Sequence, residues 1–269
     1  MRLLRFLLSI PLAAAFAADR PAEKLVAAGD LPAKQGFHLY LLIGQSNMAG
    51  RGKVDAESQP NDPRLLVFNR DGKWAVAADP LHWDKPVAGV GLGLAFARAM
   101  AAAQPGVTIG LIPCAVGGTP LKRWQKGGDL YEAAVARAKA ASASGTLMGA
   151  LWHQGESDSS SPETASTYRE RFGQMVKDLR ADLGAKDLSV VAGELGEFHV
   201  KRVGANAQTV NDALHAVAAA LPRTACVDAK ELKHGGDNLH FDAASLREFG
   251  RRYAKAMLAL AVPQSKPQP

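Results

Sequence analysis

The feature that most restricts the fold of this sequence is a regular alternation of apolar, strand-like runs with helical segments. Strand-like runs are predicted at 37–43, 107–114, 146–152, 188–192 and 224–227. Helices are predicted at 91–103, 130–142, 203–221, in a striped segment that starts at Ser161-Pro162, and after Asp242. The strands are continuous apolar runs, which is typical of parallel strands covered on both faces. The sequence therefore predicts one doubly wound α/β domain over residues 19–262.

The two ends of the chain differ in composition from this central part. Arg2 and Arg5 precede an apolar stretch at 6–14 and an Ala15-Phe16-Ala17 cleavage pattern, which predicts a signal peptide at 1–18. The apolar stretch is short for a membrane span, so export to the periplasm or the medium is favoured over a retained anchor. The polar, proline-rich residues 263–269 are expected to be disordered.

The charge pattern argues against a nucleic-acid-binding protein, and the cysteine content argues against a disulfide-rich fold. The formal net charge is +6, of which the predicted signal peptide carries two charges. The basic residues are scattered and have no interleaved aromatics, so no nucleic-acid partner is expected. The two cysteines, Cys114 and Cys226, end apolar runs and are expected to be unbridged, since two cysteines are no disulfide framework for a core of this size.

A long segment between the first strand and the first helix has no clear pattern. Residues 51–90 contain prolines, glycines, isolated aromatics such as Trp83, and one further possible strand at 65–68. Connections of this length are usually functional or partly structured.

Polar residues follow the predicted strands where those strands end. Ser46 follows the first strand, Gly117 and Gly118 follow the next clear one, and Gln154 and Glu156 follow the one after it; a further polar loop, 237–242, precedes the last helix. Since ligands of such sheets bind outside the carboxyl ends of the strands, these segments are expected to meet at one edge.

Together these residue types suit acyl transfer through a serine. His240 can act as general base to Ser46, and Asp237, three residues earlier, can hold the imidazole. The Ser46 amide, a Gly117 or Gly118 amide and the Gln154 side chain are the predicted oxyanion donors. Each of these residue types alone is common in loops, so the prediction rests on their order in the sequence and their placement at strand ends.

Two other readings use the same residues. His234, Asp237, His240 and Asp242 are dense enough to suggest a metal-dependent hydrolase, but no His-Glu-x-x-His pattern accompanies them and Ser46 would then be idle. A non-catalytic carbohydrate-binding protein is the other alternative. Neither a metal nor another cofactor is predicted.

Four segments resemble the conserved blocks of the SGNH hydrolase superfamily, in particular its sialate O-acetylesterase/acetylxylan esterase branch, carbohydrate esterase family 6. They are residues 44–48, 117–119 with Trp124, 152–158 and 237–242, and the likeness extends from about residue 37 to 260. The resemblance implies a three-layer, flavodoxin-like α/β/α fold and metal-independent removal of acetyl groups from sugars through an acetyl-enzyme. It also implies Ser46 as nucleophile, His240 as base and Asp237 as its partner.

Several assignments stay open at this stage. Glu156 is a second carboxylate that can support His240 in place of Asp237. Asn47, Trp124 and His153 are further candidates for supporting the site or contacting substrate, as are Trp83, Arg51 and Arg123. Xylan, sialic acid, pectic and peptidoglycan substrates all remain possible, and the oligomeric state is not predicted.

Overall fold

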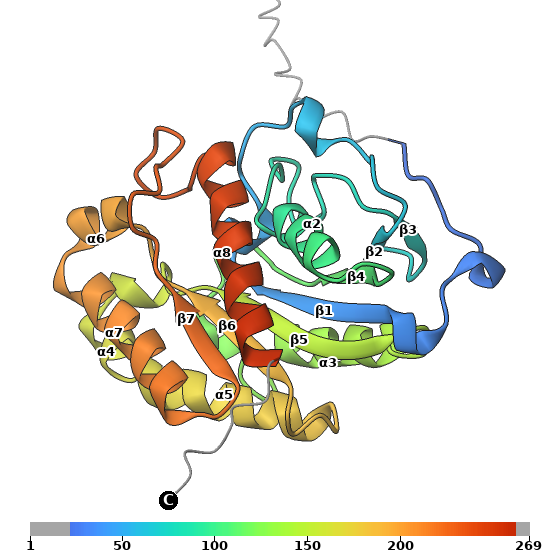
Figure 1. Cartoon of the computed structure of the whole chain (residues 1–269). Coiled ribbons are helices and arrows are strands. Elements are labelled where there is room, and N and C mark those ends of the chain that lie inside the picture. Colours follow the sequence, from blue (N-terminus) through green and yellow to red (C-terminus); the bar gives the residue numbers. More distant parts are fainter. Residues whose placement is uncertain (1–21, 262–269) are drawn as a thin grey trace, which may run out of the picture.

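The computed structural model describes residues 22–261, which build a seven-stranded sheet covered by helices on both faces (Figure 1). The strand order is β3-β2-β4-β1-β5-β6-β7, and only β3 runs antiparallel. The strands are β1 (Phe37–Gly44), β2 (Leu65–Phe68), β3 (Trp74–Val76), β4 (Thr108–Pro113), β5 (Thr146–His153), β6 (Ser189–Gly193) and β7 (Thr224–Val227). The predicted doubly wound α/β class is confirmed.

Strand β1 lies in the centre, between β4 and β5, and separates two apolar cores. Leu39, Leu41 and Ile43 pack into one core, while Tyr40 and Leu42 pack into the other. Successive side chains of a strand point to opposite faces, so a strand buried on both faces is apolar at every position. This explains the continuous apolar run in the sequence.

The helices divide between these two faces (Figure 1). One face is covered by α2 (Gly93–Ala103) and α8 (Ala243–Ala261), and the other by α3 (Asp129–Ala141), α5 (Tyr168–Asp182) and α7 (Ala205–Ala220). Asp242 caps α8 as predicted, since its Oδ1 accepts a hydrogen bond of 2.7 Å from the Ser245 amide.

Local chemistry modifies the predicted helices at two places. The segment that starts at Ser161 is divided into α4 (Pro162–Ser166) and α5, with Thr167 between them at φ of −94° and ψ of −1°. A separate helix, α6 (Glu197–Val203), precedes α7, and Gly204, with φ of 83°, makes the turn between them. Neither break has a proline to mark it in the sequence.

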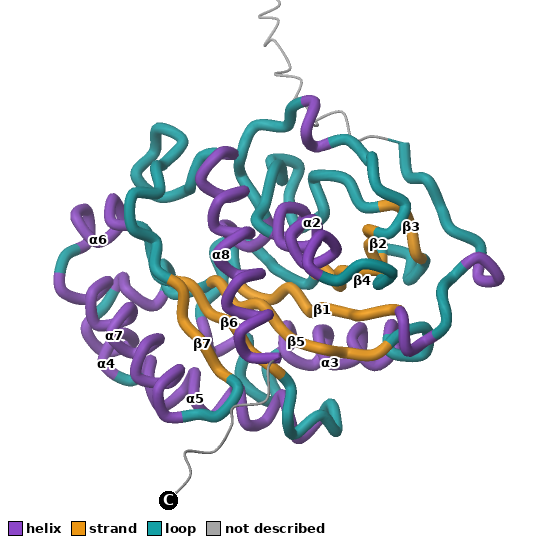
Figure 2. Tube along the Cα trace, viewed as in Figure 1, coloured by secondary structure: helices purple, strands orange, loops and turns teal. Residues whose placement is uncertain are grey.

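The segment between β1 and α2 is mostly loop, interrupted by β2 and β3 (Figure 2). The predicted strand at 65–68 is β2, while β3 was not predicted. Both cysteines are free, as expected. No helix among residues 22–261 has the length and apolar character to cross a bilayer. The predicted signal peptide and the predicted disordered tail lie outside the described residues.

Asp79 is a fully buried carboxylate in this long segment. Its Oδ1 accepts a hydrogen bond of 3.5 Å from the Gly91 amide, and burial raises its pKa to about 7. The unfolded chain releases this proton near pH 4, so it binds fewer protons than the native state between pH 4 and 7. Asp79 therefore makes the native state less stable as the pH rises through that range.

We expect Asp79→Asn to remove this pH-dependent penalty. Asparagine keeps an acceptor for the Gly91 amide but has no charge to bury. The free energy of unfolding of the variant should exceed that of the wild type by roughly 2–4 kcal/mol more at pH 8 than at pH 4. Urea denaturation at both pH values measures this difference, and a constant difference would contradict the assignment.

Candidate active site

Ser46 is held at the end of β1 by a single helical turn, α1 (Ser46–Ala49). The amides of Met48 and Ala49 donate to the Gln45 carbonyl, and the Gly50 amide donates to the Ser46 carbonyl. Because Ser46 is the first residue of this turn, its own N–H has no partner within the helix. The hydroxyl and the amide of Ser46 are therefore both available at the strand end.

His240 and Asp237 come to Ser46 from the loop that precedes α8. His240 Nε2 lies 2.9 Å from Ser46 Oγ, and His240 Nδ1 lies 2.6 Å from Asp237 Oδ2. Asp237 Oδ1 also accepts the amides of Leu239 and His240 at 2.9 and 2.8 Å. Partial burial works to raise the pKa of Asp237, but these amides and the imidazole outweigh it and lower that pKa to about 2. The carboxylate is thus ionised at the pH values at which an imidazole base works.

Asn47 ties the histidine loop to the serine turn. Its Oδ1 accepts the Phe241 amide at 3.1 Å, and its Nδ2 donates to the Leu239 carbonyl at 3.1 Å. These are the backbone groups on either side of His240, so Asn47 holds both peptide neighbours of the imidazole. Asn47 Nδ2 also donates to Glu156 Oε1 at 2.5 Å.

Glu156 does not contact the imidazole. It is buried beside Asn47, and burial raises the pKa of its carboxyl. Of the two carboxylates left open by the sequence, Asp237 is the one bonded to His240, while Glu156 acts on the loop through Asn47.

Two backbone N–H groups and one side-chain amide belong to residues that line the cleft at Ser46 and are candidates for oxyanion donors. The Ser46 amide is one, and the Gly118 amide, which no described residue accepts, is another. The carboxamide of Gln45 lines the same cleft, and its Oε1 accepts from the Ser157 amide, which leaves Nε2 as the end available to a ligand. Gly117, the alternative predicted donor, gives its N–H to Asp84 Oδ2 at 2.8 Å and is therefore engaged.

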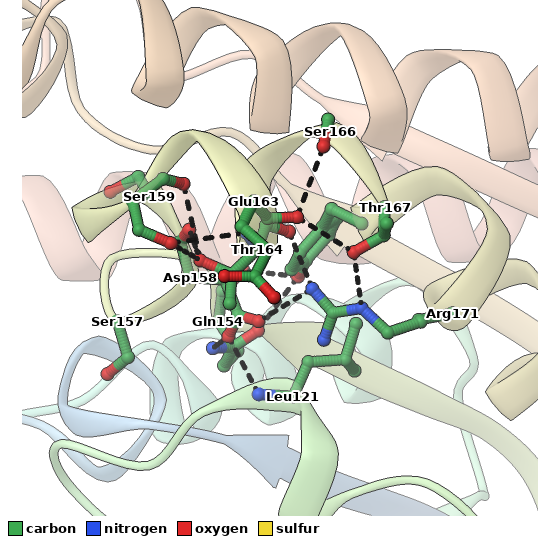
Figure 3. Close-up of polar contacts among 12 residues, drawn as sticks. Leu121, Gln154, Ser157, Asp158, Ser159, Glu163, Thr164, Ser166, Thr167 and Arg171 are labelled. Atoms are coloured by element: carbon green, nitrogen blue, oxygen red, sulfur yellow. Dashed lines mark hydrogen bonds and ion pairs between the residues drawn. The ribbon is translucent and has the colours of Figure 1, made fainter.

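Gln154 lies behind the site and does not line it, which corrects its predicted role as an oxyanion donor. Its Nε2 donates to Asp158 Oδ2 at 2.7 Å and to the Thr119 carbonyl at 3.1 Å, and it also lies 3.3 Å from Gln45 Oε1, so its two hydrogens are taken up by acceptors within the protein. Asp158 in turn accepts the Leu121 amide and pairs with Arg171 (Figure 3). The side chain of Gln154 thus fixes the loop that carries Gly118.

Trp124 and His153, predicted to support the site or to contact substrate, are both buried and lie in supporting positions. Trp124 is buried against Trp152 and donates its indole N–H to Thr119 Oγ1 at 3.0 Å. It therefore supports the loop that carries Gly118 from the interior of the protein. His153 is buried between Phe241 and Phe249, where burial lowers its pKa to about 3.

Two further candidates for contacting substrate, Trp83 and Arg123, also lie away from the cleft. Trp83 packs under the guanidinium of Arg137, and Arg123 pairs with Asp129. Neither lines the cleft at Ser46.

The alternative metal ligands turn in different directions. His234 Nδ1 accepts the amides of Gly236 and Asn238, Asp242 caps α8, and Asp237 bonds to His240. In the part of the chain that the structure describes, no group of three such side chains is arranged to hold a metal ion.

Ser46 and His240 open into a cleft of about 600 Å³. Its walls include three cationic side chains, Arg51, Lys85 and Arg202. Arg51 is paired with Asp84, whereas Lys85 and Arg202 form no ion pair with a described carboxylate. Gln45, Asp84, Lys85 and Arg202 were not among the site residues predicted from the sequence. Gln45 alone had a visible signal, since it stands beside Ser46 at the strand end.

Comparisons with known proteins agree with this fold. A family model described as carbohydrate esterase, sialic acid-specific acetylesterase matches residues 36–259. The chain is 34% identical over 242 residues to the probable carbohydrate esterase At4g34215 of Arabidopsis thaliana, which covers 82% of this chain and 90% of that protein.

Solved structures show the same fold. The crystal structure of the Arabidopsis protein matches with a TM-score of 0.77 and 32% identity, over 85% of this chain and 99% of that one. The structure of NanS matches with a TM-score of 0.70 and 18% identity, over 85% and 98%. The fold and these relatives define the protein as an esterase. More narrowly, the chain belongs to the carbohydrate esterase family of sialic acid-specific acetylesterases.

Replacing the two carboxylates separately distinguishes their roles. Asp237→Asn should lower kcat for p-nitrophenyl acetate by about 10- to 10³-fold, because the imidazole loses its charged partner. This is less than for a fully buried carboxylate, because Asp237 is half exposed to water. Glu156→Gln keeps an acceptor for Asn47 and should change kcat by less than ~10-fold. A larger loss in Glu156→Gln than in Asp237→Asn would reverse the assignment.

Proposed function

We propose that this protein removes O-acetyl groups from carbohydrates, with Ser46 as the nucleophile of an acetyl-enzyme mechanism. The observation that carries the proposal is the continuous chain from Ser46 Oγ through the His240 imidazole to the Asp237 carboxylate, open to the cleft. Membership of the carbohydrate esterase family supports the substrate class. The proposal includes export, which rests on the pattern of residues 1–18 alone and which cell fractionation would test.

In the first half-reaction, Ser46 Oγ attacks the acetyl carbonyl carbon while His240 Nε2 takes the hydroxyl proton. The carbonyl oxygen becomes an oxyanion within reach of the Ser46 and Gly118 amides. Collapse of this intermediate breaks the bond to the sugar oxygen, which receives the proton from His240. The imidazolium formed in between is stabilised by Asp237.

In the second half-reaction, water takes the place of the sugar. His240 removes a proton from it as it attacks the acetyl-serine, and the same amides receive the second oxyanion. When the bond to Ser46 Oγ breaks, His240 returns its proton to the serine, and acetic acid leaves and loses its remaining proton to the solvent. No other group is needed to balance either step.

We expect Ser46→Ala and His240→Ala to lose comparable activity, each by at least ~10³-fold in kcat, because members of a catalytic unit are not additive. Turnover of p-nitrophenyl acetate measures both, and the double variant should be little worse than either single variant. If wild type and Ser46→Ala turn over p-nitrophenyl acetate at the same rate, and that rate exceeds the buffer blank, Ser46 is not the nucleophile. That result would also favour the alternative of a non-catalytic carbohydrate-binding protein.

Charge in the cleft favours a substrate sugar that bears a carboxylate, such as a sialic or uronic acid, over a neutral xylan. Lys85 and Arg202 are exposed on the walls of the cleft that contains Ser46. Arg202 is oriented by its contact of 3.1 Å with His199 Nδ1. Two cations without a carboxylate partner attract an anionic ligand, and a guanidinium suits a carboxylate especially well.

A panel of acetylated glycans tests this preference. The double variant Lys85→Ala/Arg202→Gln should raise KM for acetylated acidic sugars by about 5- to 50-fold, and leave p-nitrophenyl acetate and acetylated xylan within ~2-fold. Lys139→Ala, which removes an exposed lysine of α3 away from the cleft, is the matched control. Equal changes for acidic and neutral substrates would refute the preference without affecting the role of Ser46.

A further inference from the structure

We propose that Asp84 is a positioning residue that builds the oxyanion site by fixing the Gly117–Gly118 turn against the nucleophile. The inference rests on the proposed role of Ser46. It concerns a residue in the long segment 51–90, outside all of the segments that suggested an esterase from the sequence.

Asp84 is an interior carboxylate with a complete set of partners. Its side chain is 1% exposed and that of Arg51 is 8% exposed. Arg51 Nη2 lies 2.7 Å from Asp84 Oδ2, and Nη1 lies 3.4 Å from Oδ1, so the pair is bidentate. Burial works to raise the pKa of Asp84, but the Arg51 guanidinium and the Gly117 N–H outweigh it and hold the pKa below its usual value. The carboxylate is thus a fixed negative charge.

The same pair joins three separate parts of the site. Arg51 Nη1 donates to the Gly50 carbonyl at 2.7 Å, next to the turn that carries Ser46. Asp84 Oδ2 accepts the Gly117 amide at 2.8 Å. The serine turn, the long segment and the glycine turn are therefore connected through a few direct bonds that bypass the sheet.

Gly117 has no room for a side chain at this junction. A Cβ there would lie 2.3 Å from Arg51 Nη2, 3.0 Å from Asp84 Oδ2 and 3.4 Å from Ser46 Cβ. The glycine thus allows the backbone to lie directly between the ion pair and the nucleophile. Gly118 follows with φ of 78°, which turns the chain sharply after the anchored amide.

The two adjacent amides, of Gly117 and Gly118, therefore have different roles. Gly117 N–H points inward to Asp84, and Gly118 N–H, which no described residue accepts, remains for the substrate. Gln154 holds the far side of the turn through the Thr119 carbonyl. An oxyanion donor acts only if it is in place before charge develops, so anchoring Gly117 preorganises Gly118.

The test compares Asp84→Ala, which removes the acceptor of the Gly117 amide, with Asp84→Asn, which keeps one. Asp84→Ala should lower kcat for p-nitrophenyl acetate by about 10- to 10²-fold with KM within ~3-fold, and Asp84→Asn should recover part of the loss. Asp79→Asn is the matched control, since it neutralises another buried carboxylate of the same segment, and should keep kcat within ~2-fold of wild type.

A second readout separates positioning from general damage. The ratio of kcat/KM for an ester to that for the matching thionoester, whose carbonyl oxygen is replaced by sulfur, depends on the oxyanion donors. This ratio should fall in Asp84→Ala and stay at the wild-type value in Asp79→Asn. If Asp84→Ala is unfolded by thermal melt, Arg51→Gln/Asp84→Ala takes its place, since it also removes the acceptor of the Gly117 amide and leaves no unpaired buried charge.

Two results would overturn the proposal. One is wild-type kcat in a folded variant that carries Asp84→Ala, and the other is an equal loss on ester and thionoester in that variant. In both cases an inactive Ser46→Ala shows that the nucleophile assignment stands and that only the role of Asp84 fails. An active Ser46→Ala would instead remove the proposed function itself.

Discussion

The parallel pairing of β1 with both β4 and β5 is the constraint on which the rest of the molecule depends. Leu41 is in register with Ile112 on one side and with Ala150 on the other, so three strands end at the same edge. The loops that follow them carry the serine, the glycine turn and the Gln154 segment. Because strand ends fix where these loops begin, residues more than 100 positions apart in the chain meet without a dedicated binding domain.

The sheet brings the loops together, but buried polar groups determine their shape. Asp84, Asp158 and Glu156 each accept hydrogen bonds from a loop that faces the cleft, and each is buried. Burying a carboxylate is unfavourable unless it is paired or hydrogen-bonded, so these groups hold a loop in one arrangement only while their partners stay in place. Two of the three are Arg-paired, whereas Glu156 is hydrogen-bonded to the Asn47 side chain and burial raises the pKa of its carboxyl.

Site residues could be predicted from the sequence where the chemistry requires a particular residue type at the end of a strand. They could not be predicted where a residue's position is determined by contacts with distant parts of the chain. Ser46, His240 and Asp237 were found because periodicity located the strands and because Asp237 reaches His240 within one turn. Gln154 was misassigned because an amide after a strand can face the cleft or the core, and only Asp158 and Thr119 decide which. Such partners are tertiary, and no local pattern encodes them.

The same argument explains why the long segment 51–90 was the least predictable, although it supplies Arg51, Asp84 and Lys85 to the site. It has no hydrophobic period, since its conformation is determined by single contacts such as Asp84 to Gly117. A loop fixed in this way can change its outward residues, Lys85 among them, without disturbing the anchor beneath. Under the two proposals made above, acyl transfer and substrate choice are separable within one segment: the inward carboxylate of Asp84 serves the chemistry, and the neighbouring outward cation of Lys85 serves binding of the sugar. The first depends on preorganised geometry and the second on charge that water can screen, so substrate preference should vary more readily than mechanism on this fold.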